Sequence, residues 1–202
     1  MEITTVLLLI AIIAIFVGAS VLKSKQTDVI VLPPPINTNI SQITEDVYIS
    51  DRMTASDYES LKRLGIKQIL IVGSEIPRHG DLYFKVFHVK INDLPTENIK
   101  KYFNPSFNFI KKNKTLIHCA MGVSRSVSIA IAYLMRSRGL SFDEAFSLVK
   151  KNRHIACPNP GFILQLKQYE TELMAKKEAN GDDDGGDDGD KADQDGQGNS
   201  SR

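Results

Sequence analysis

The sequence contains no tryptophan and only two cysteines, Cys119 and Cys157, among its 202 residues. Two cysteines are too few for the disulfide framework that stabilises many secreted domains, so we expect a reducing compartment. Hydrophobic residues make up 42% of the chain and charged residues 24%, which is normal for a globular protein. The length predicts one domain with appendages.

Net charge is also scarce, at a formal +1, but the two signs are unevenly distributed. Residues 180–202 hold eight aspartates against two basic residues, a formal charge of −6, so the preceding 179 residues carry +7. A segment without aromatic residues cannot bury enough apolar surface to order itself, and we therefore predict a disordered acidic tail at residues 178–202. The basic body suits an anionic substrate.

No charged residue occurs between positions 3 and 22, and Lys23 and Lys25 follow directly. Twenty helical residues would span about 30 Å, the thickness of a bilayer core. The sequence therefore predicts an N-terminal transmembrane anchor at residues 1–22 and, from the positive-inside rule, a single-pass membrane protein with a cytoplasmic domain. A cleaved signal peptide is disfavoured because no lysine or arginine precedes the apolar run.

The remaining patterns predict a linker and one α/β domain. Three consecutive prolines in residues 23–39 favour a stiff, extended linker. We expect strands at residues 47–50, 67–72, 84–91 and 115–118, and helices at residues 54–64, 99–110, 126–138 and 161–174. A further helix follows a capping box formed by Ser141 and Glu144. This alternation predicts a single domain over residues 40–177, with a central mixed sheet flanked by helices.

One stretch, residues 116–126, combines groups that suit phosphate chemistry. A short apolar strand leads into a loop of mostly small residues and then into a helix, where free N–H groups can converge on an anion. Gly122 allows a close backbone approach, and Arg125 offers a planar fork that matches two phosphate oxygens. The same positive field favours the thiolate of Cys119, which would lie beneath the phosphate and be placed to attack phosphorus.

The pattern His118-Cys119-x5-Arg125-Ser126 resembles the signature of the protein tyrosine phosphatase superfamily. The fuller HCAMGVSRS, with AYLM at residues 132–135, is most similar to its dual-specificity branch. The resemblance covers about residues 40–174, where ITEDVYIS, LGIKQILIV and PNPGF look like other stretches of that branch. It implies a phosphatase domain that uses neither a cofactor nor a metal.

The resemblance also implies roles for individual residues. Cys119 would form a phosphocysteine while Arg125 holds the phosphoryl oxygens, and Ser126 would donate a hydrogen bond to the sulfur. Asp93 would protonate the departing oxygen and later activate water. We expect His118 to hold the loop by hydrogen bonds. The loop residues expected to bind the phosphoryl group, together with Arg125, are Ala120, Met121, Gly122, Val123 and Ser124.

The sequence departs from the family pattern in one respect. Asp93 precedes Cys119 by fewer residues than the family pattern leads us to expect, and the missing residues fall after Ile110. This region is distant from the Asp93 loop, so the assignment of the general acid to Asp93 is kept. Asp81 and Glu97 are the weaker alternatives.

The resemblance implies a protein phosphatase that acts on phosphotyrosine and on phosphoserine or phosphothreonine, with a phosphorylated protein as its partner. A phosphoinositide phosphatase, an RNA 5′-phosphatase and a phosphate-binding scaffold without turnover are the alternatives. Lipid-directed relatives often carry lysines in the loop, and residues 120–124 contain none. We expect no nucleic-acid partner, and the sequence predicts no particular oligomeric state.

Overall fold

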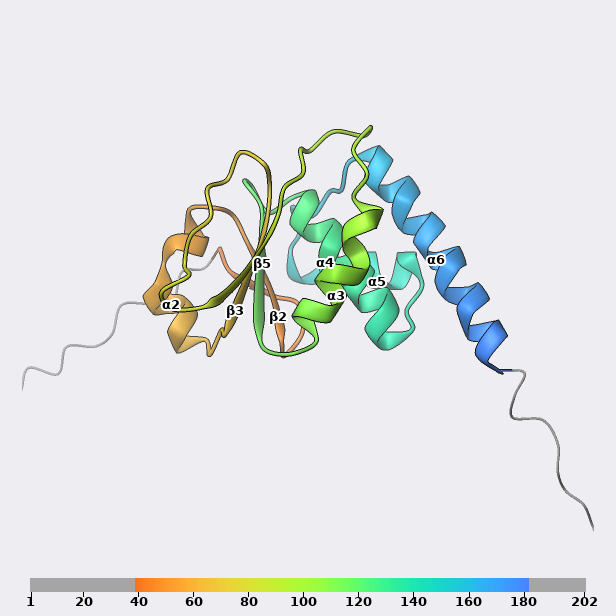
Figure 1. The fold of residues 1–202 in the computed structure, drawn as a ribbon, viewed down its shortest axis with the longest axis horizontal. Helices are drawn as coiled ribbons and strands as arrows, with labels where there is room; N and C mark the ends of the chain where they lie inside the picture. Colours follow the sequence, from red (N-terminus) through yellow and green to blue (C-terminus); the bar gives the residue numbers. More distant parts are fainter. Residues whose placement is uncertain (1–38, 182–202) are drawn as a thin grey trace, which may run out of the picture. The chain divides into compact units, whose positions relative to one another are not determined.

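A computed structural model describes residues 39–181, which form an α/β domain (Figure 1). The predicted anchor at residues 1–22, the linker up to residue 38 and the chain after Gly181 lie outside the described residues. Within residues 39–181, no helix has both the length and the apolar character needed to cross a membrane.

The centre of the domain is a five-stranded mixed sheet in the order β1-β2-β5-β3-β4. Its strands are β1 (Ser41–Gln42), β2 (Val47–Ser50), β3 (Gln68–Val72), β4 (Lys85–Val89) and β5 (Thr115–His118). β1 pairs antiparallel with β2, and all other neighbours are parallel. Ser50 and Ile71 lie on either side of His118, so the carboxyl ends of three strands meet just before Cys119. Ligand sites of open parallel sheets form at such an edge.

Helices cover both faces of this sheet. They are the 3₁₀ turns η1 (Thr54–Ser56) and η2 (Lys100–Tyr102) and the α-helices α2 (Tyr58–Arg63), α3 (Phe103–Ile110), α4 (Arg125–Arg138), α5 (Phe142–Asn152) and α6 (Pro160–Gly181). Figure 1 shows α2 on one side of the sheet and α3, α4, α5 and α6 on the other. The predicted α/β architecture with a covered mixed sheet is therefore confirmed.

The core follows the two-residue period of the strands. Ile69 and Ile71 of β3 belong to the cluster on the α2 side, whereas Leu70 and Val72 belong to the larger cluster that includes the buried face of α4. Because β3 is buried on both faces, its sequence is a continuous apolar run rather than an alternating one. This double burial fixes the position of β5, which pairs with β3.

The helix boundaries confirm one prediction and correct two. Ser141 and Glu144 form the predicted capping box at the start of α5. The single helix predicted at residues 54–64 is divided instead, because the side chain of Asp57 accepts the Ser60 N–H and begins α2 there. Helix α6 continues beyond Met174 to Gly181, four residues into the segment predicted as tail.

Candidate active site

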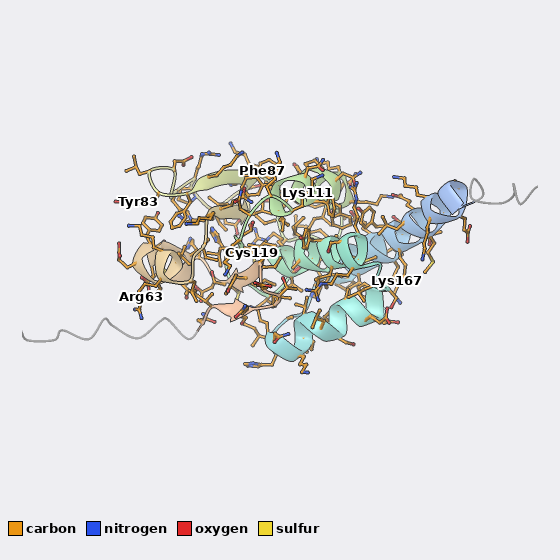
Figure 2. All side chains as sticks on the ribbon, turned by 90° about the horizontal axis from the view of Figure 1, so that it is seen from below. Arg63, Tyr83, Phe87, Lys111, Cys119 and Lys167 are labelled. Atoms are coloured by element: carbon orange, nitrogen blue, oxygen red, sulfur yellow. The ribbon has the colours of Figure 1, made fainter. Side chains whose placement is uncertain are left out.

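Cys119 follows the last residue of β5 and is only 2% exposed. Figure 2 shows it near the centre of the domain, close to the start of α4. Its Sγ accepts the Gly122 N–H at 3.2 Å and lies 3.3 Å from Oγ of Ser126, which is fully buried. The Ser126 hydroxyl can donate to sulfur, so the Cys119 side chain has two neighbouring hydrogen-bond donors.

Gly122 provides the turn that brings the loop back over the sulfur. Its φ is +67°, which costs little only for glycine. A Cβ atom here would come within 2.5 Å of both the Ser50 carbonyl oxygen and Nη2 of Arg153. The backbone therefore passes too close to its neighbours for any side chain at this position.

Arg125 is the first residue of α4, and its side chain is almost fully buried. Its Nη1 donates to one oxygen of the Glu75 carboxylate at 2.7 Å, and its Nη2 lies 2.7 Å from the other oxygen in an ion pair. Burial lowers the pKa of Arg125, but the hydrogen bond to Glu75 and the negative charge of Cys119 outweigh this effect and raise the pKa above its ordinary value. The guanidinium is therefore a fixed positive charge.

The Nε group of Arg125 is a buried hydrogen-bond donor that lacks an acceptor in the described domain. It lies 3.7 Å from Oδ2 of Asp93 and has no hydrogen-bond partner among residues 39–181. A buried donor without an acceptor costs free energy, so a group that supplies an oxygen here would be bound favourably. A phosphoryl oxygen fits this requirement.

Asp93 lies beside Arg125 and is held by two further side chains. Its Oδ1 accepts hydrogen bonds from Oγ of Ser124 at 2.7 Å and from Nδ2 of Asn159 at 2.8 Å. The backbone N–H of Asn159 in turn donates to Ser124 Oγ at 3.0 Å. The structure therefore brings Asp93 to the loop and to Arg125, as expected from the sequence.

The two alternative acids have other partners. Asp81 accepts hydrogen bonds from Arg78, and both side chains are about half exposed. Glu97 accepts a hydrogen bond from Nδ2 of Asn92 at 2.8 Å. Among these three acids, only Asp93 contacts a residue of the loop.

Backbone contacts hold the remaining loop residues. The Ala120 carbonyl accepts the Arg52 N–H at 3.1 Å, and the Val123 carbonyl accepts the Cys157 N–H at 2.8 Å. Because these carbonyls bond to the surrounding protein, loop N–H groups remain for an anion. Both cysteines are free thiols. Within the described chain, no group of three or more histidine, cysteine or acidic residues could hold a metal.

Sequence reasoning missed Arg153, which bonds to two carbonyls of the loop. This side chain is buried and donates to the Gly122 carbonyl at 2.6 Å and to the Met121 carbonyl at 3.3 Å. It also reaches the Asn39 carbonyl and Oγ of Ser41. In the sequence, Arg153 stands in the basic run KKNRH, which is indistinguishable from a solvated helix end.

Glu75 and Asn159 were also missed. Glu75 follows a buried strand, where a carboxylate is unremarkable until the partner Arg125 is known. Asn159 belongs to the PNPGF stretch, which resembles the dual-specificity branch, but its partner Asp93 is 66 residues away in the sequence. Neither contact produces a local pattern in the sequence.

His118 connects the loop to a chain of hydrogen bonds. Because the Cys119 carbonyl can only accept, Nδ1 of His118 is the donor in their 3.4 Å contact. Nε2 of His118 must then accept from Nε2 of His79 at 3.1 Å, and Nδ1 of His79 accepts from the Tyr58 hydroxyl at 3.1 Å. Burial lowers the pKa of His118 to about 4, so the ring is neutral at neutral pH.

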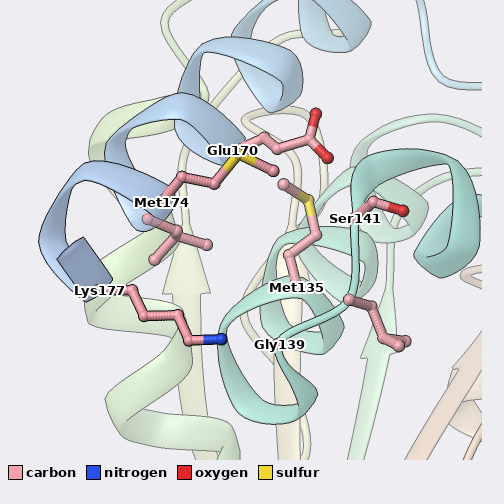
Figure 3. A pocket seen from close by; sticks show the side chains of 8 residues that line it. Met135, Gly139, Ser141, Glu170, Met174 and Lys177 are labelled. Carbon is pink, nitrogen blue, oxygen red and sulfur yellow. The ribbon is translucent and has the colours of Figure 1, made fainter. Parts of the chain in front are cut away.

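A separate cavity of about 180 Å³ lies at the other end of α4 (Figure 3). It is bounded by α4, the turn at residues 139–141 and α6, and the side chains of Met135 and Met174 extend into it. Met135 follows Arg125 by ten residues on one helix, a separation of about 15 Å. This cavity is therefore distinct from the thiol site.

The comparisons with known proteins agree with this geometry. Residues 47–172 match the family described as "Dual specificity phosphatase, catalytic domain". The chain belongs to the dual-specificity phosphatase family. It therefore carries a phosphatase catalytic domain, which confirms the resemblance drawn from residues 118–126.

Individual relatives of this dual-specificity phosphatase domain include human Protein phosphatase Slingshot homolog 2, with 36% identity over 68% of this chain and 10% of that protein. Dual specificity protein phosphatase 1B of Arabidopsis thaliana is 35% identical over 67% of this chain and 84% of that protein. The chain thus spans only a small part of the Slingshot protein that it matches.

Solved structures show the same fold. A mouse putative dual specificity phosphatase complexed with zinc tungstate superimposes with a TM-score of 0.67 and 30% identity, covering 72% of this chain and 95% of that one. Human DUSP28 superimposes with a TM-score of 0.65 and 29% identity, covering 70% of this chain and 99% of that one.

Proposed function

We propose that the protein hydrolyses phosphotyrosine and phosphoserine or phosphothreonine in proteins through a phosphocysteine intermediate. The observation that carries this proposal is the buried Nε of Arg125, which lacks a hydrogen-bond acceptor within the described residues. In the same site, the Gly122 N–H donates to the sulfur of Cys119. A tetrahedral oxyanion supplies the missing oxygen. The mouse relative was solved with tungstate, which is itself a tetrahedral oxyanion.

In the first step, the sulfur of Cys119 attacks phosphorus while the bond to the leaving oxygen breaks. Asp93 gives its proton to that oxygen, and the sulfur carries the phosphoryl group. Arg125, held by Glu75, stabilises the charge on the phosphoryl oxygens.

In the second step, water attacks the phosphocysteine. Asp93 accepts the proton of this water, and phosphate leaves. The hydroxyl of Ser126, 3.3 Å from the sulfur, donates to the departing thiolate. Each step therefore uses a residue that the fold brings to the loop.

The test is hydrolysis of an aryl phosphate by the full chain in detergent micelles. We expect turnover by the unaltered protein, none by Cys119→Ser, and a phosphorylated cysteine in acid-quenched protein. Phosphate binding without turnover in the unaltered protein would contradict the proposal and support a scaffold. Asp93→Ala, which slows cleavage of the bound phosphoprotein, would serve to trap substrates.

We also propose that residues 1–22 anchor the chain in a membrane and that the catalytic domain is cytoplasmic. The support is the uncharged run at residues 3–22, followed by Lys23 and Lys25. The full chain should remain with membranes after alkaline carbonate extraction, whereas a chain lacking residues 1–22 should be released. Release of the full chain by carbonate would refute the anchor.

A further inference from the structure

Four exposed apolar side chains are carried by the loop of the thiol site and by three segments that contact this loop. We propose that these side chains bind a phosphorylated peptide segment whose residues next to the phosphoresidue are apolar. The inference rests on the proposed function and names the substrate class of the same site. The four side chains, here called the apolar rim, are Met53 (76% exposed), Leu94 (52%), Met121 (71%) and Ile155 (40%).

Two members of the rim are attached to the first half of the loop. Met121 belongs to the loop itself and precedes Gly122, whose N–H bonds to the sulfur of Cys119. Met53 follows Arg52, whose backbone N–H donates to the Ala120 carbonyl at 3.1 Å. Both side chains are therefore carried by backbone in direct contact with the phosphate-binding segment.

The other two members are attached to the second half of the loop. Leu94 follows Asp93, whose carboxylate accepts the Ser124 hydroxyl at 2.7 Å. Ile155 lies between Arg153, which bonds to the Met121 and Gly122 carbonyls, and Cys157, whose N–H bonds to Val123. The loop itself and three segments that contact it thus each carry one exposed apolar side chain.

This grouping needs a physical reason, because exposed apolar surface costs free energy in water. The large apolar side chains that are exposed elsewhere in residues 39–181 are Leu82, Tyr83, Leu164 and Met174. Half of the eight such residues in the described domain therefore lie on segments that contact one short loop. Grouped apolar side chains on a soluble surface mark an interaction site.

The burial of the sulfur determines what the rim contacts. Cys119 is 2% exposed, so the phosphoryl group must enter the loop and the atoms attached to it must remain at the mouth. Neighbouring residues of a peptide substrate then lie against the rim. Acidic neighbours would meet the exposed carboxylate of Glu75 and the partly exposed one of Asp93, whereas apolar neighbours would bury apolar surface.

The charges of the rim favour a peptide over a bilayer. Anionic membranes are bound by clusters of about four to eight lysines and arginines. Within two residues of any rim side chain, Arg52 is the only exposed lysine or arginine, because Arg153 is buried. The opposing carboxylates of Asp51 and Asp93 further reduce attraction to an anionic surface.

The experiment measures binding of phosphotyrosine peptides to the full chain carrying Cys119→Ser. The peptides differ only in the residues beside the phosphotyrosine, which are leucine, serine or glutamate. We expect the leucine peptide to bind about tenfold more tightly than the glutamate peptide. Replacing Met53, Leu94 and Ile155 together by glutamine should remove about this tenfold advantage. The affinity for the glutamate peptide should remain unchanged.

The matched control replaces Leu82 and Met174, which are exposed apolar residues away from the loop, by glutamine. This control should bind the leucine peptide as tightly as the unaltered rim does. With Cys119 present, the rim variant should hydrolyse an aryl phosphate at the unaltered rate, because this small substrate does not reach the rim. A lower rate of aryl phosphate hydrolysis would show that the rim variant damages the loop.

Equal affinity for the three peptides would overturn the inference. Phosphate release from phosphoinositide vesicles that is lost in the rim variant would also overturn it, by assigning the surface to a bilayer. Failure of the unaltered chain to hydrolyse any aryl phosphate would refute the proposed function. The binding comparison would still decide whether the rim selects apolar peptides, because it requires no turnover.

Discussion

Nη1 of Arg125 donates a hydrogen bond of 2.7 Å to one oxygen of the Glu75 carboxylate, and Nη2 forms an ion-pair contact of 2.7 Å with the other oxygen. This paired contact holds the guanidinium in place, and Nε, 3.7 Å from Oδ2 of Asp93, has no hydrogen-bond partner in residues 39–181. The hydrogen bond from Arg125 lowers the pKa of Glu75, so the carboxylate remains ionised in mildly acidic solution. The orientation of a residue proposed to bind substrate therefore depends on one that does not contact the sulfur.

Glu75→Gln should lower kcat/KM for an aryl phosphate by about tenfold to a hundredfold, because one charge-assisted bond of about 1.5–3 kcal/mol is weakened. Asp81→Asn removes a comparable exposed carboxylate that pairs with Arg78 and should leave kcat/KM unchanged. Steady-state kinetics on both variants would check this, and equal losses would argue against the orienting role.

Gly122→Ala should reduce kcat/KM by about a hundredfold or more, because a displacement of about 1 Å near the reacting atoms can have this effect. The added Cβ would collide with the Ser50 carbonyl. Gly139→Ala is the matched control, since Gly139 has a similar φ of +64° but no atom within 4 Å of the added Cβ. Gly139→Ala should lower the free energy of unfolding of the domain by about 1–2 kcal/mol and retain activity. Urea unfolding and kinetics separate the two effects.

Arg153→Met should destabilise the domain by about 3 kcal/mol and abolish most activity, because buried carbonyls of the loop lose their donor. Arg136→Met removes an exposed arginine from α4 and should cost only about 0–1 kcal/mol. Urea unfolding would measure both changes. If Arg153→Met unfolded at the same urea concentration as the unaltered protein, the bonds to Met121 and Gly122 would not stabilise the loop.

Asp93→Asn should reduce kcat by about a hundredfold or more for phosphoserine, because general acid catalysis contributes about 10²–10⁴-fold. The loss should be smaller for aryl phosphates whose leaving groups are acidic and need no proton. Measuring kcat across a series of leaving groups would reveal this dependence. A loss that is equal for all leaving groups would assign Asp93 a purely structural role.

Acidification should destabilise the domain through His118. Its pKa in the fold is about 4, against 6.5 in the unfolded chain, so the unfolded chain binds more protons between these values. The stability contribution is complete above pH 6.5 and falls by about 3 kcal/mol as the pH drops to about 4. Urea unfolding between pH 7 and pH 4 should show this slope. His118→Gln should reduce the slope.

Local patterns predicted most of the fold. The strands at residues 47–50 and 115–118 have the predicted boundaries, because each apolar run is bounded by polar or turn residues. The short β1 was missed, since two residues carry no periodic signal and pair only because β2 offers an open edge. The break at Asp57 was missed because a side-chain cap competed with an otherwise continuous helical pattern.

The candidate site was predictable only where its residues are close in the sequence. Cys119, Arg125 and Ser126 lie within one loop and the first turn of one helix, so their spacing encodes their proximity. Glu75 and Arg153 reach the loop through contacts that depend on sheet order and helix packing. No local pattern distinguishes such residues from ordinary surface charges.

The nucleophile is synthesised well before its environment exists. Arg153 and Asn159 emerge from the ribosome after Cys119, and both are needed for the contacts around the loop and Asp93. A nascent or proteolytically shortened chain that ends before them would carry the thiol without its assembled surroundings. The surroundings of the thiol can thus be assembled only once the chain has been made through residue 159.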